Sequence, residues 1–372
     1  MENQSELPSL YLWAEGNPPK WLNEEDNEIR HSIYVACRAK AKTARELLYE
    51  TGLSQEQLDS ILADSVEEGT LKKVAGDAYL TDFCVMPAQA FYDAECRINE
   101  IYENIGQEIT DVLEEKKAAI WAHDFYGNQL PYSYLLWILY VFACDRFKHL
   151  ADEKNRQIWQ DKIPGDNGKN YRLAGTFMLP GEEIVQQEDP LNQVSWSRQL
   201  TYFESDKGRM VFVNCFDYPP FKDGERNGLV NAKNVPLLFK LIESGGEYRL
   251  SRDEAEHVAF LRHYGIIIKE EGLLKVNIPV ITHECEAQIQ RCLDDLLKPL
   301  VDKYFDSVTG AADTFIRPHI REDLLEEYIN DVLSDLYNPQ GYVLFWAMYI
   351  GETLDMVFDR SGAALYLKTI AG

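Results

Sequence analysis

The sequence predicts an α+β protein that is mostly helical, with two winged helix-turn-helix modules, long packing helices and a β-rich insert. Three observations support this fold class. In residues 27–87, the first module, apolar residues recur at helical and then at strand spacing, which gives the order helix, helix, helix, hairpin. Longer apolar stripes with a three-four spacing follow, as is typical of helices packed along other helices. The order of elements then repeats after residue 233, which favours an internal duplication.

Capping signals place the helices of the first module. The first helix is predicted over residues 28–41, where apolar side chains share one face. Thr43 and Glu46 have the spacing of a capping box at the start of the second helix, and Gly52 ends that helix. Ser54 is the predicted N-cap of the third helix.

Strand signals complete the first module, and an N-terminal arm precedes it. The wing is a predicted β-hairpin of residues 71–74 and 79–85, joined by a turn at Ala75-Gly76-Asp77. The arm, residues 1–26, is polar except for an apolar patch at Leu10-Tyr11-Leu12-Trp13 and Trp21. We expect this patch to fold back onto the first module, because an exposed apolar patch would make the terminus sticky.

Three parts are predicted around a second module (residues 234–282): a helical region, a β-rich insert and a C-terminal helical region. Their residues are 88–156, 157–233 and 283–372. The helical region contains predicted helices, a long amphipathic one and a very apolar one, over 88–117 and 132–147. Gly, Pro, Asn and Asp punctuate strand-like runs in the insert, at 171–179, 194–203 and 209–216.

The second module repeats the order of the first. Two helices are predicted over 234–242 and 252–264, and Ser251 caps the second of them. A hairpin of residues 266–269 and 273–281 follows. The next predicted helix, 284–304, takes the position that the long amphipathic helix has in the first half.

The charge balance disfavours partners that carry negative charge. The chain has 37 Lys and Arg against 62 Asp and Glu, which gives a formal net charge of -25 and a pI near 4.7. This balance opposes binding to anionic membranes and to bulk nucleic acid. No basic-then-apolar signal opens the sequence, and the longest apolar run, 134–144, is about half the length that crosses a bilayer. We therefore expect a soluble, cytoplasmic protein.

No residue pattern points to catalysis, a cofactor or a metal. The 7 cysteines are scattered without a CxxC pair, and the 7 histidines lack the spacing that would place two ligands on one helix face. A GxSxG motif is absent from the sequence. The acidic residues Glu322-Asp323 and Glu326-Glu327 are interpreted as the solvated face of a helix. We therefore predict no catalytic, cofactor-binding or metal-binding residues. The alternative is an enzyme with its site between the β-rich insert and the apolar helices.

The charges around the third helix oppose the usual role of a winged helix. Such modules commonly lay this helix in the major groove, where Arg, Lys, Asn and Gln meet bases and phosphates. No basic residue lies between Arg45 and Lys72, whereas the acidic residues there are Glu46, Glu50, Glu56, Asp59, Asp64, Glu67 and Glu68. Non-specific affinity for DNA comes mainly from counterion release by Lys and Arg, so this helix lacks the main favourable contribution.

A DNA-binding alternative would use the first helix and the wing instead of the third helix. The basic residues available there are Arg38, Lys40, Lys42, Arg45, Lys72 and Lys73. A continuous basic patch across them would favour DNA contact. The other interpretation is an ordinary solvated face with cations near a helix C-terminus.

The segment from Lys42 to Phe83 carries a family resemblance. Its strings Thr43-Ala44-Arg45-Glu46-Leu47 and Gly76-Asp77-Ala78-Tyr79-Leu80-Thr81-Asp82-Phe83 resemble the winged-helix modules attached to the C-terminal side of some bacterial extracytoplasmic-function sigma factors. The plan of the rest, an apolar Trp helix, a Gly-rich β stretch and a second winged helix, also looks like those regions. This resemblance implies a bacterial, transcription-associated regulatory protein without a catalytic motif. The promoter-binding regions of a sigma factor are not visible in the sequence.

The sequence as a whole favours a non-catalytic regulatory protein that binds another protein, such as a transcription component, or senses a ligand. Ile98, Ile101 and Ile105 on the long amphipathic helix are the candidate partner surface, with core packing as the alternative. DNA is a disfavoured partner because of the charge balance, and no membrane partner is expected.

Overall fold

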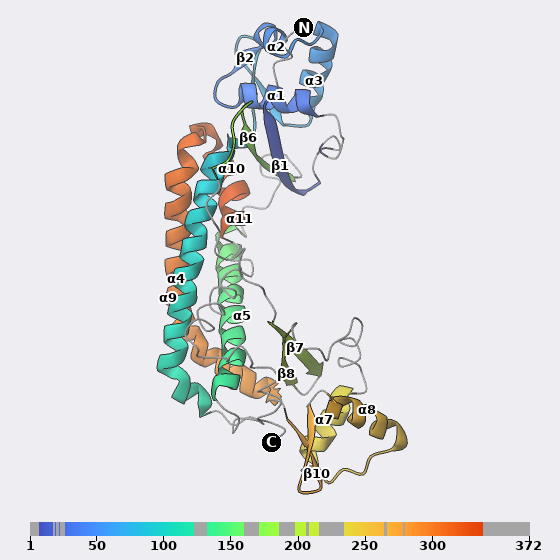
Figure 1. Ribbon diagram of the computed structural model, residues 1–372. Coiled ribbons are helices and arrows are strands. Elements are labelled where there is room, and N and C mark those ends of the chain that lie inside the picture. The colour runs from blue at the N-terminus through green and yellow to red at the C-terminus, as the bar shows by residue number, and fades with distance from the viewer. Residues whose placement is uncertain are drawn as a thin grey trace. The chain divides into compact units, whose positions relative to one another are not determined.

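The computed structural model in Figure 1 describes residues 7–17, 19, 22, 27–122, 132–159, 171–185, 198–205, 208–215, 234–263, 266–277 and 280–337. Over these residues the predicted α+β class, mostly helical with small sheets, is confirmed. The chain divides into two compact units, each built from separate stretches of sequence. Unit 1 holds Met1–Asn104, Lys148–Glu188 and Val301–Tyr342, and unit 2 holds Ile105–Phe147, Asp189–Leu300 and Val343–Gly372. Within the described ranges, every helix is too short or too polar to span a bilayer.

The first module lies in unit 1 and consists of helices around a small sheet. Its elements are α1 (Glu28–Cys37), β2 (Lys42–Thr43), α2 (Ala44–Thr51), α3 (Gln55–Glu67), β3 (Leu71–Val74) and β4 (Ala78–Thr81). The predicted capping box of α2 is confirmed: the Thr43 hydroxyl accepts from the Glu46 N–H at 3.3 Å, and the Glu46 carboxylate accepts from the Thr43 N–H at 2.7 Å. Ser54 caps α3 as predicted, and Gly52 ends α2 in the left-handed region with φ 68°.

The first helix is shorter than predicted. α1 ends at Cys37 and not at residue 41, because Lys42 and Thr43 form the strand β2. This strand pairs with β4, and β4 pairs with β3, so the sheet has the order β2-β4-β3. The sheet thus joins the segment between α1 and α2 to the β3–β4 hairpin.

The predicted second strand of the wing, 79–85, is wrong, because two strands occupy this stretch. β4 ends at Thr81, and the N–H of Asp82 donates a hydrogen bond to the carbonyl of Thr70 at 3.0 Å. The second strand, β5 (Cys84–Pro87), joins a different sheet. The apolar pattern of residues 79–85 therefore continues past the point where the chain leaves one sheet and enters another.

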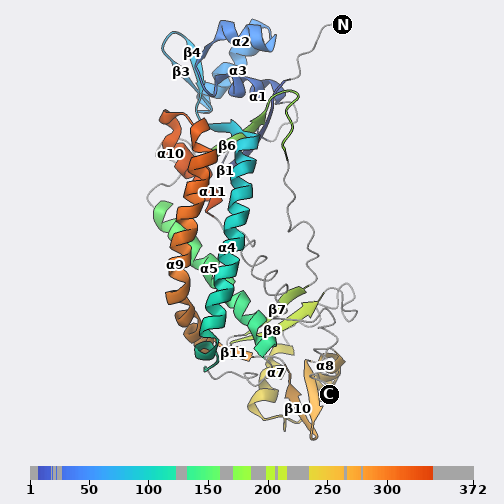
Figure 2. The same cartoon turned by 60° about the vertical axis from the view of Figure 1, so that its left-hand side comes forward.

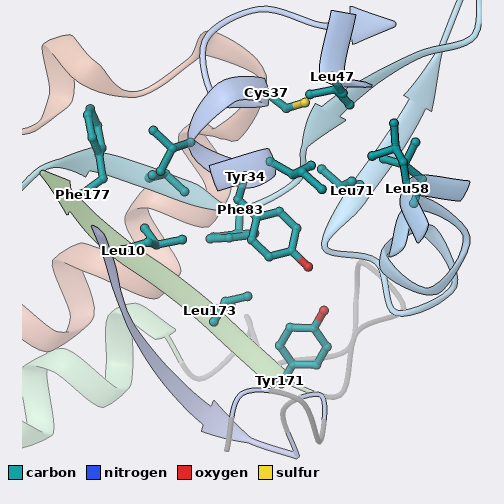
Figure 3. Close-up of a cluster of buried hydrophobic side chains, with 14 residues drawn as sticks. Leu10, Tyr34, Cys37, Leu47, Leu58, Leu71, Phe83, Tyr171, Leu173 and Phe177 are labelled. Carbon is teal, nitrogen blue, oxygen red and sulfur yellow. The ribbon is translucent and has the colours of Figure 1, made fainter. Parts of the chain in front are cut away.

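That second sheet connects the N-terminal strand to the first module. β1 (Ser9–Gly16) pairs antiparallel with β6 (Tyr171–Met178), and β5 pairs parallel with β6, giving the order β1-β6-β5. The predicted arm is a strand over these residues. Its expected return to the first module is confirmed for Leu10, which belongs to the same buried cluster as Tyr34 and Phe83 (Figure 3).

Long helices begin where the modules end. They are α4 (Ala88–Trp121), α5 (Tyr132–Trp159) and α9 (His283–Phe315), and each continues beyond its predicted range. In unit 1, the rings of Tyr102 and Tyr304 stack with centroids 5.9 Å apart, and Lys154 bonds to Asp302 at 2.6 Å. Within this unit α9 therefore packs beside both α4 and α5.

A run of short helical turns follows α9 in unit 1, and we name it the clasp segment (residues 317–337). Its elements are η3 (Arg317–His319), η4 (Glu322–Leu324), α10 (Leu325–Tyr328), the π-helical turn η5 (Ile329–Leu333) and α11 (Ser334–Leu336). Figure 2 shows α10 near the β3–β4 hairpin of the first module. The sequence pattern predicted an amphipathic helix here and missed this arrangement.

The second module lies in unit 2, and its predicted helices are confirmed. Its elements are α7 (Asn234–Glu243), α8 (Arg252–His263), β9 (Ile267–Glu270), β10 (Leu273–Val276) and β11 (Val280–Thr282). The Ser251 hydroxyl accepts from the Glu254 N–H at 3.2 Å, which confirms the predicted cap. The return bond from the Ser251 N–H, with the bond from Lys240, lowers the pKa of Glu254 to about 2.

The predicted strand 273–281 is wrong in the same way as its counterpart in the first module. β10 ends at Val276, and the N–H of Asn277 donates a hydrogen bond to the carbonyl of Ile266 at 2.8 Å. β11 then joins a different sheet and leads directly into α9, as β5 leads directly into α4. The two halves therefore share a local detail that the sequence pattern does not show.

The strands of the predicted β-rich insert belong to two sheets. β6 lies in the sheet of unit 1, between β1 and β5. The others, β7 (Arg198–Ser205) and β8 (Gly208–Cys215), form a hairpin in unit 2, where β8 also pairs with β11. These pairings do not gather the insert into one sheet.

Candidate functional site

The outer surface of α2 and α3 is the most distinctive surface of the first module, and we name it the acidic face. Its exposed carboxylates are those of Glu46, Glu50, Glu56, Asp59, Asp64 and Glu67. α3 carries no Lys or Arg. The aromatic ring of Tyr49, on α2, stands out of this face with the residue 92% exposed. α2 also carries one exposed cation, Arg45. The acidic face therefore combines an excess of negative charge with one large exposed aromatic side chain.

Local hydrogen bonds keep some of these carboxylates ionised and in place. The bonds from the backbone N–H and the hydroxyl of Thr43 lower the pKa of Glu46. Asp59 accepts a bond from Gln55 at 2.7 Å, and Asp64 pairs with Arg30 at 3.3 Å. These bonds thus favour the ionised form of Glu46 and hold the side chains of Asp59 and Asp64 in place.

The basic residues predicted as a nucleic-acid contact are mostly engaged within the chain. Arg38 lies with its guanidinium 4.1 Å above the ring of Phe177, and burial lowers its pKa. Lys42 bonds to the carboxylate of Glu50 at 2.6 Å. Neither cation stands alone on the surface.

The two lysines of the β3–β4 hairpin are also paired. Lys72 lies 3.2 Å from Asp82 and 2.5 Å from Asp323, and Lys73 lies 2.8 Å from Asp77. Burial alone would lower the pKa of Lys72, but its hydrogen bonds to Asp323 and Asp82 outweigh burial and raise it.

Lys40 and Arg45 are exposed. Among the six predicted contact residues, the other four have a carboxylate partner or a ring partner within the chain. A phosphate would have to compete with those partners. The structure therefore does not present the six side chains as one set of unengaged cations.

The predicted partner surface on α4 is covered by the chain itself. Ile98, Ile101 and Ile105 are 4%, 5% and 1% exposed. Core packing, the alternative that the sequence left open, describes all three side chains. They offer no surface to another protein in this conformation.

Sequence reasoning missed the role of Arg321 and Asp323. Asp323 was interpreted as part of a solvated acidic face, yet it accepts bonds from both Arg321 and Lys72. The sequence separation between Lys72 and Asp323 is 251 residues, so no local pattern could signal the pair. Both residues belong to the contact between the clasp segment and the first module.

The described part of the chain contains no group of three or more His, Cys, Asp and Glu residues arranged to hold a metal ion. Cys37 and Cys144 are buried, and burial raises the pKa of the Cys37 thiol to about 12, so that thiol is not a reactive thiolate. The geometry thus supplies surfaces for contact more clearly than groups for chemistry. Comparison with protein-family models, with curated proteins and with solved structures finds no match to this chain.

Proposed function

We propose that this chain is a non-catalytic regulatory protein that uses winged-helix modules to bind another protein. The succession α1-β2-α2-α3-β3-β4 supports a winged helix in the first module, because three helices are followed by a hairpin whose strand β4 pairs with the short strand β2. The resemblance to modules of bacterial sigma factors makes a component of the transcription machinery the leading candidate for the partner. Sensing of a ligand is the second form this regulatory role could take.

We also propose that the second module arose by duplication of the first. The support is a shared pattern of backbone hydrogen bonds at the end of the helix that precedes the hairpin (α3 and α8) and at the end of the hairpin itself. In the first module, the N–H of Thr70 donates to the carbonyl of Ser65, and the N–H of Asp82 donates to the carbonyl of Thr70. In the second module, the N–H of Ile266 donates to the carbonyl of Leu261, and the N–H of Asn277 donates to the carbonyl of Ile266.

The observation that carries the proposal of a protein partner is the charge of α3. A helix that enters the major groove needs Arg, Lys, Asn or Gln at its exposed positions. α3 offers carboxylates and no cation, and its exposed glutamines, Gln55 and Gln57, bond to Asp59 and to the N-cap Ser54. The cations of the hairpin are neutralised by Asp77, Asp82 and Asp323. Counterion release, the main source of affinity for DNA, is therefore small for this module.

The acidic face is the surface that we assign to the partner. Tyr is among the residues enriched at the energetic centres of protein interfaces, and Tyr49 is nearly fully exposed on this face. The surrounding carboxylates favour a partner whose contact surface carries Lys or Arg, since complementary charges speed association and select partners. The proposed contact therefore places Tyr49 against an apolar spot within a basic surface.

Site-specific photocrosslinking tests the proposed function. A photoreactive phenylalanine derivative at position 49 should form crosslinks to a protein partner in living cells, and the same derivative at position 103 should not. Glu103 is an exposed residue of α4 and serves as the matched control. Charge reversal by Glu56→Lys with Asp59→Lys should suppress the crosslinks. Crosslinks to nucleic acid at position 49, or equal protein crosslinks at both positions, would contradict the proposal.

A further inference from the structure

Arg321 of the clasp segment joins two distant parts of the first module. Its Nη1 donates to the carbonyl of Arg38 at 2.6 Å, and its Nη2 donates to the carbonyl of Thr81 at 2.8 Å. One acceptor follows the end of α1 and the other is the last residue of β4. The Arg321 side chain is only 13% exposed, so this contact is largely shielded from water and salt.

Asp323 makes a second and more exposed contact with the same module. Its carboxylate accepts from Lys72 Nζ at 2.5 Å and from Arg321 Nε at 2.9 Å. The hydrogen bond from Arg321, followed by that from Lys72, holds the pKa of Asp323 well below its usual range. The Lys72 and Asp323 side chains are 35% and 45% exposed, so salt weakens this pair more than it weakens the Arg321 contact.

The rest of the clasp segment is anchored to the β1-β6-β5 sheet. The carbonyl of Leu324 accepts from Cys84 Sγ at 3.8 Å, and the carbonyl of Asp331 accepts from Trp13 Nε1 at 3.4 Å. The hydroxyl of Ser334 accepts from Arg172 Nη1 at 3.4 Å. The segment therefore has one end on the first module and the remainder on the sheet.

One buried group lowers the cost of loosening the clasp segment. Tyr328 is 2% exposed, and its hydroxyl has no hydrogen-bond partner among the described residues. The π-helical turn η5 follows it directly. A buried hydroxyl without a hydrogen bond carries a desolvation penalty. If the segment opens, water can bond to the Tyr328 hydroxyl, and this penalty is removed.

We propose that the clasp segment is a strap that releases the first module in two steps. Salt or a competing anion first opens the outer catch, Lys72 with Asp323, and frees the Lys72 side chain on β3. The inner catch, Arg321 on the carbonyls of Arg38 and Thr81, then still holds the end of α1 and the end of β4. The β3 side of the hairpin can thus be presented to a partner while β4 and the helices of the module keep their positions.

Hydrogen exchange of the full chain, read by mass spectrometry, tests this strap with matched variants. Asp323→Asn and Lys72→Met should raise exchange about tenfold in peptides covering 71–77 and leave 36–43 unchanged, as expected for the loss of a hydrogen bond to a charged group. Arg321→Met should raise exchange in both peptides. Raising NaCl from about 0.05 M to about 1 M should reproduce the effect of Asp323→Asn in the unaltered protein, because the Debye length falls to about 3 Å.

Two substitutions are controls, because they break pairs of similar chemistry outside the two catches. Arg317→Met removes a pair with Asp313, and Lys73→Met removes the pair with Asp77. Neither should change exchange in the two peptides by more than about twofold. The proposal is overturned if Arg321→Met matches Arg317→Met, or if Asp323→Asn raises both peptides equally. Should Arg321→Met fail to fold, Asp323→Asn, Lys72→Met and the salt series decide the question.

Discussion

Replacing Arg146 with Met lowers the free energy of unfolding by about 3 kcal/mol, because it removes the bidentate cation from a largely buried carboxylate. Arg146 donates through Nε and Nη2 to both oxygens of Asp294, the latter bond at 2.8 Å, and both side chains are 19% exposed. A bidentate pair with this little exposure is held in one geometry and is poorly screened by salt. Urea unfolding followed by far-UV circular dichroism measures the loss.

The matched control is Lys154, which pairs with Asp302. There the two side chains are 32% and 69% exposed, and the lysine forms a single bond to the carboxylate. Lys154→Met should cost no more than about 1 kcal/mol, as surface pairs generally do. Equal losses for Arg146→Met and Lys154→Met would contradict the assignment of a special structural role to the pair of Arg146 and Asp294.

Replacing Gly175 with Ala lowers stability by about 2 to 3 kcal/mol, the range of an overpacked core position. A Cβ at this position would lie 2.6 Å from Leu12 Cδ2 and 2.8 Å from the carbonyl oxygen of Tyr11. Leu12 and Gly175 are paired in the ladder between β1 and β6, so the backbone oxygen cannot move away without disrupting the pairing. Hydrogen exchange of residues 9–16 would show the weakened strand.

Gly310 is the control for that substitution. It lies inside α9, and a Cβ there would meet nothing within 4 Å. Gly310→Ala should raise stability by about 0.5 to 1 kcal/mol, because Ala has the better helix propensity and a less flexible unfolded chain. A similar loss of stability for both variants would show that the close approach of β1 is not the reason why position 175 requires glycine.

The helices of the first module could be predicted from the sequence because their signals are local. The side chains of Thr43 and Ser54 satisfy N–H groups three residues away, and Gly52 adopts the left-handed conformation at the next turn. Such interactions depend on neighbours in the chain and on little else. The sequence therefore located these helices, although it extended α1 past Cys37.

The strands were harder to predict because their partners are distant. The apolar pattern of 79–85 continues through Asp82, yet the chain changes sheet there, since β5 finds its partner β6 about ninety residues later. Leu10 faces Phe177 across a still longer separation, 167 residues along the chain. Alternation of apolar residues signals a strand but carries no information on which sheet the strand joins.

The candidate site could be predicted only in part for the same reason. The sequence shows the sign of every charge, and the acidic character of α3 follows from it directly. It does not show that Lys72 meets Asp323 or that Arg38 lies over Phe177. The exposure of Tyr49 and the burial of Ile98 also depend on tertiary packing, which periodicity alone does not specify.

Binding to random duplex DNA at low and moderate salt tests the central claim most directly. With fluorescently labelled DNA in about 0.05 M salt, where electrostatic attraction is strong, the account predicts no detectable binding by the full chain. Binding that weakens steeply with salt, and that Lys40→Glu with Arg45→Glu abolishes, would contradict it. That result would assign the first module to DNA through its exposed cations and would remove the basis for a protein partner.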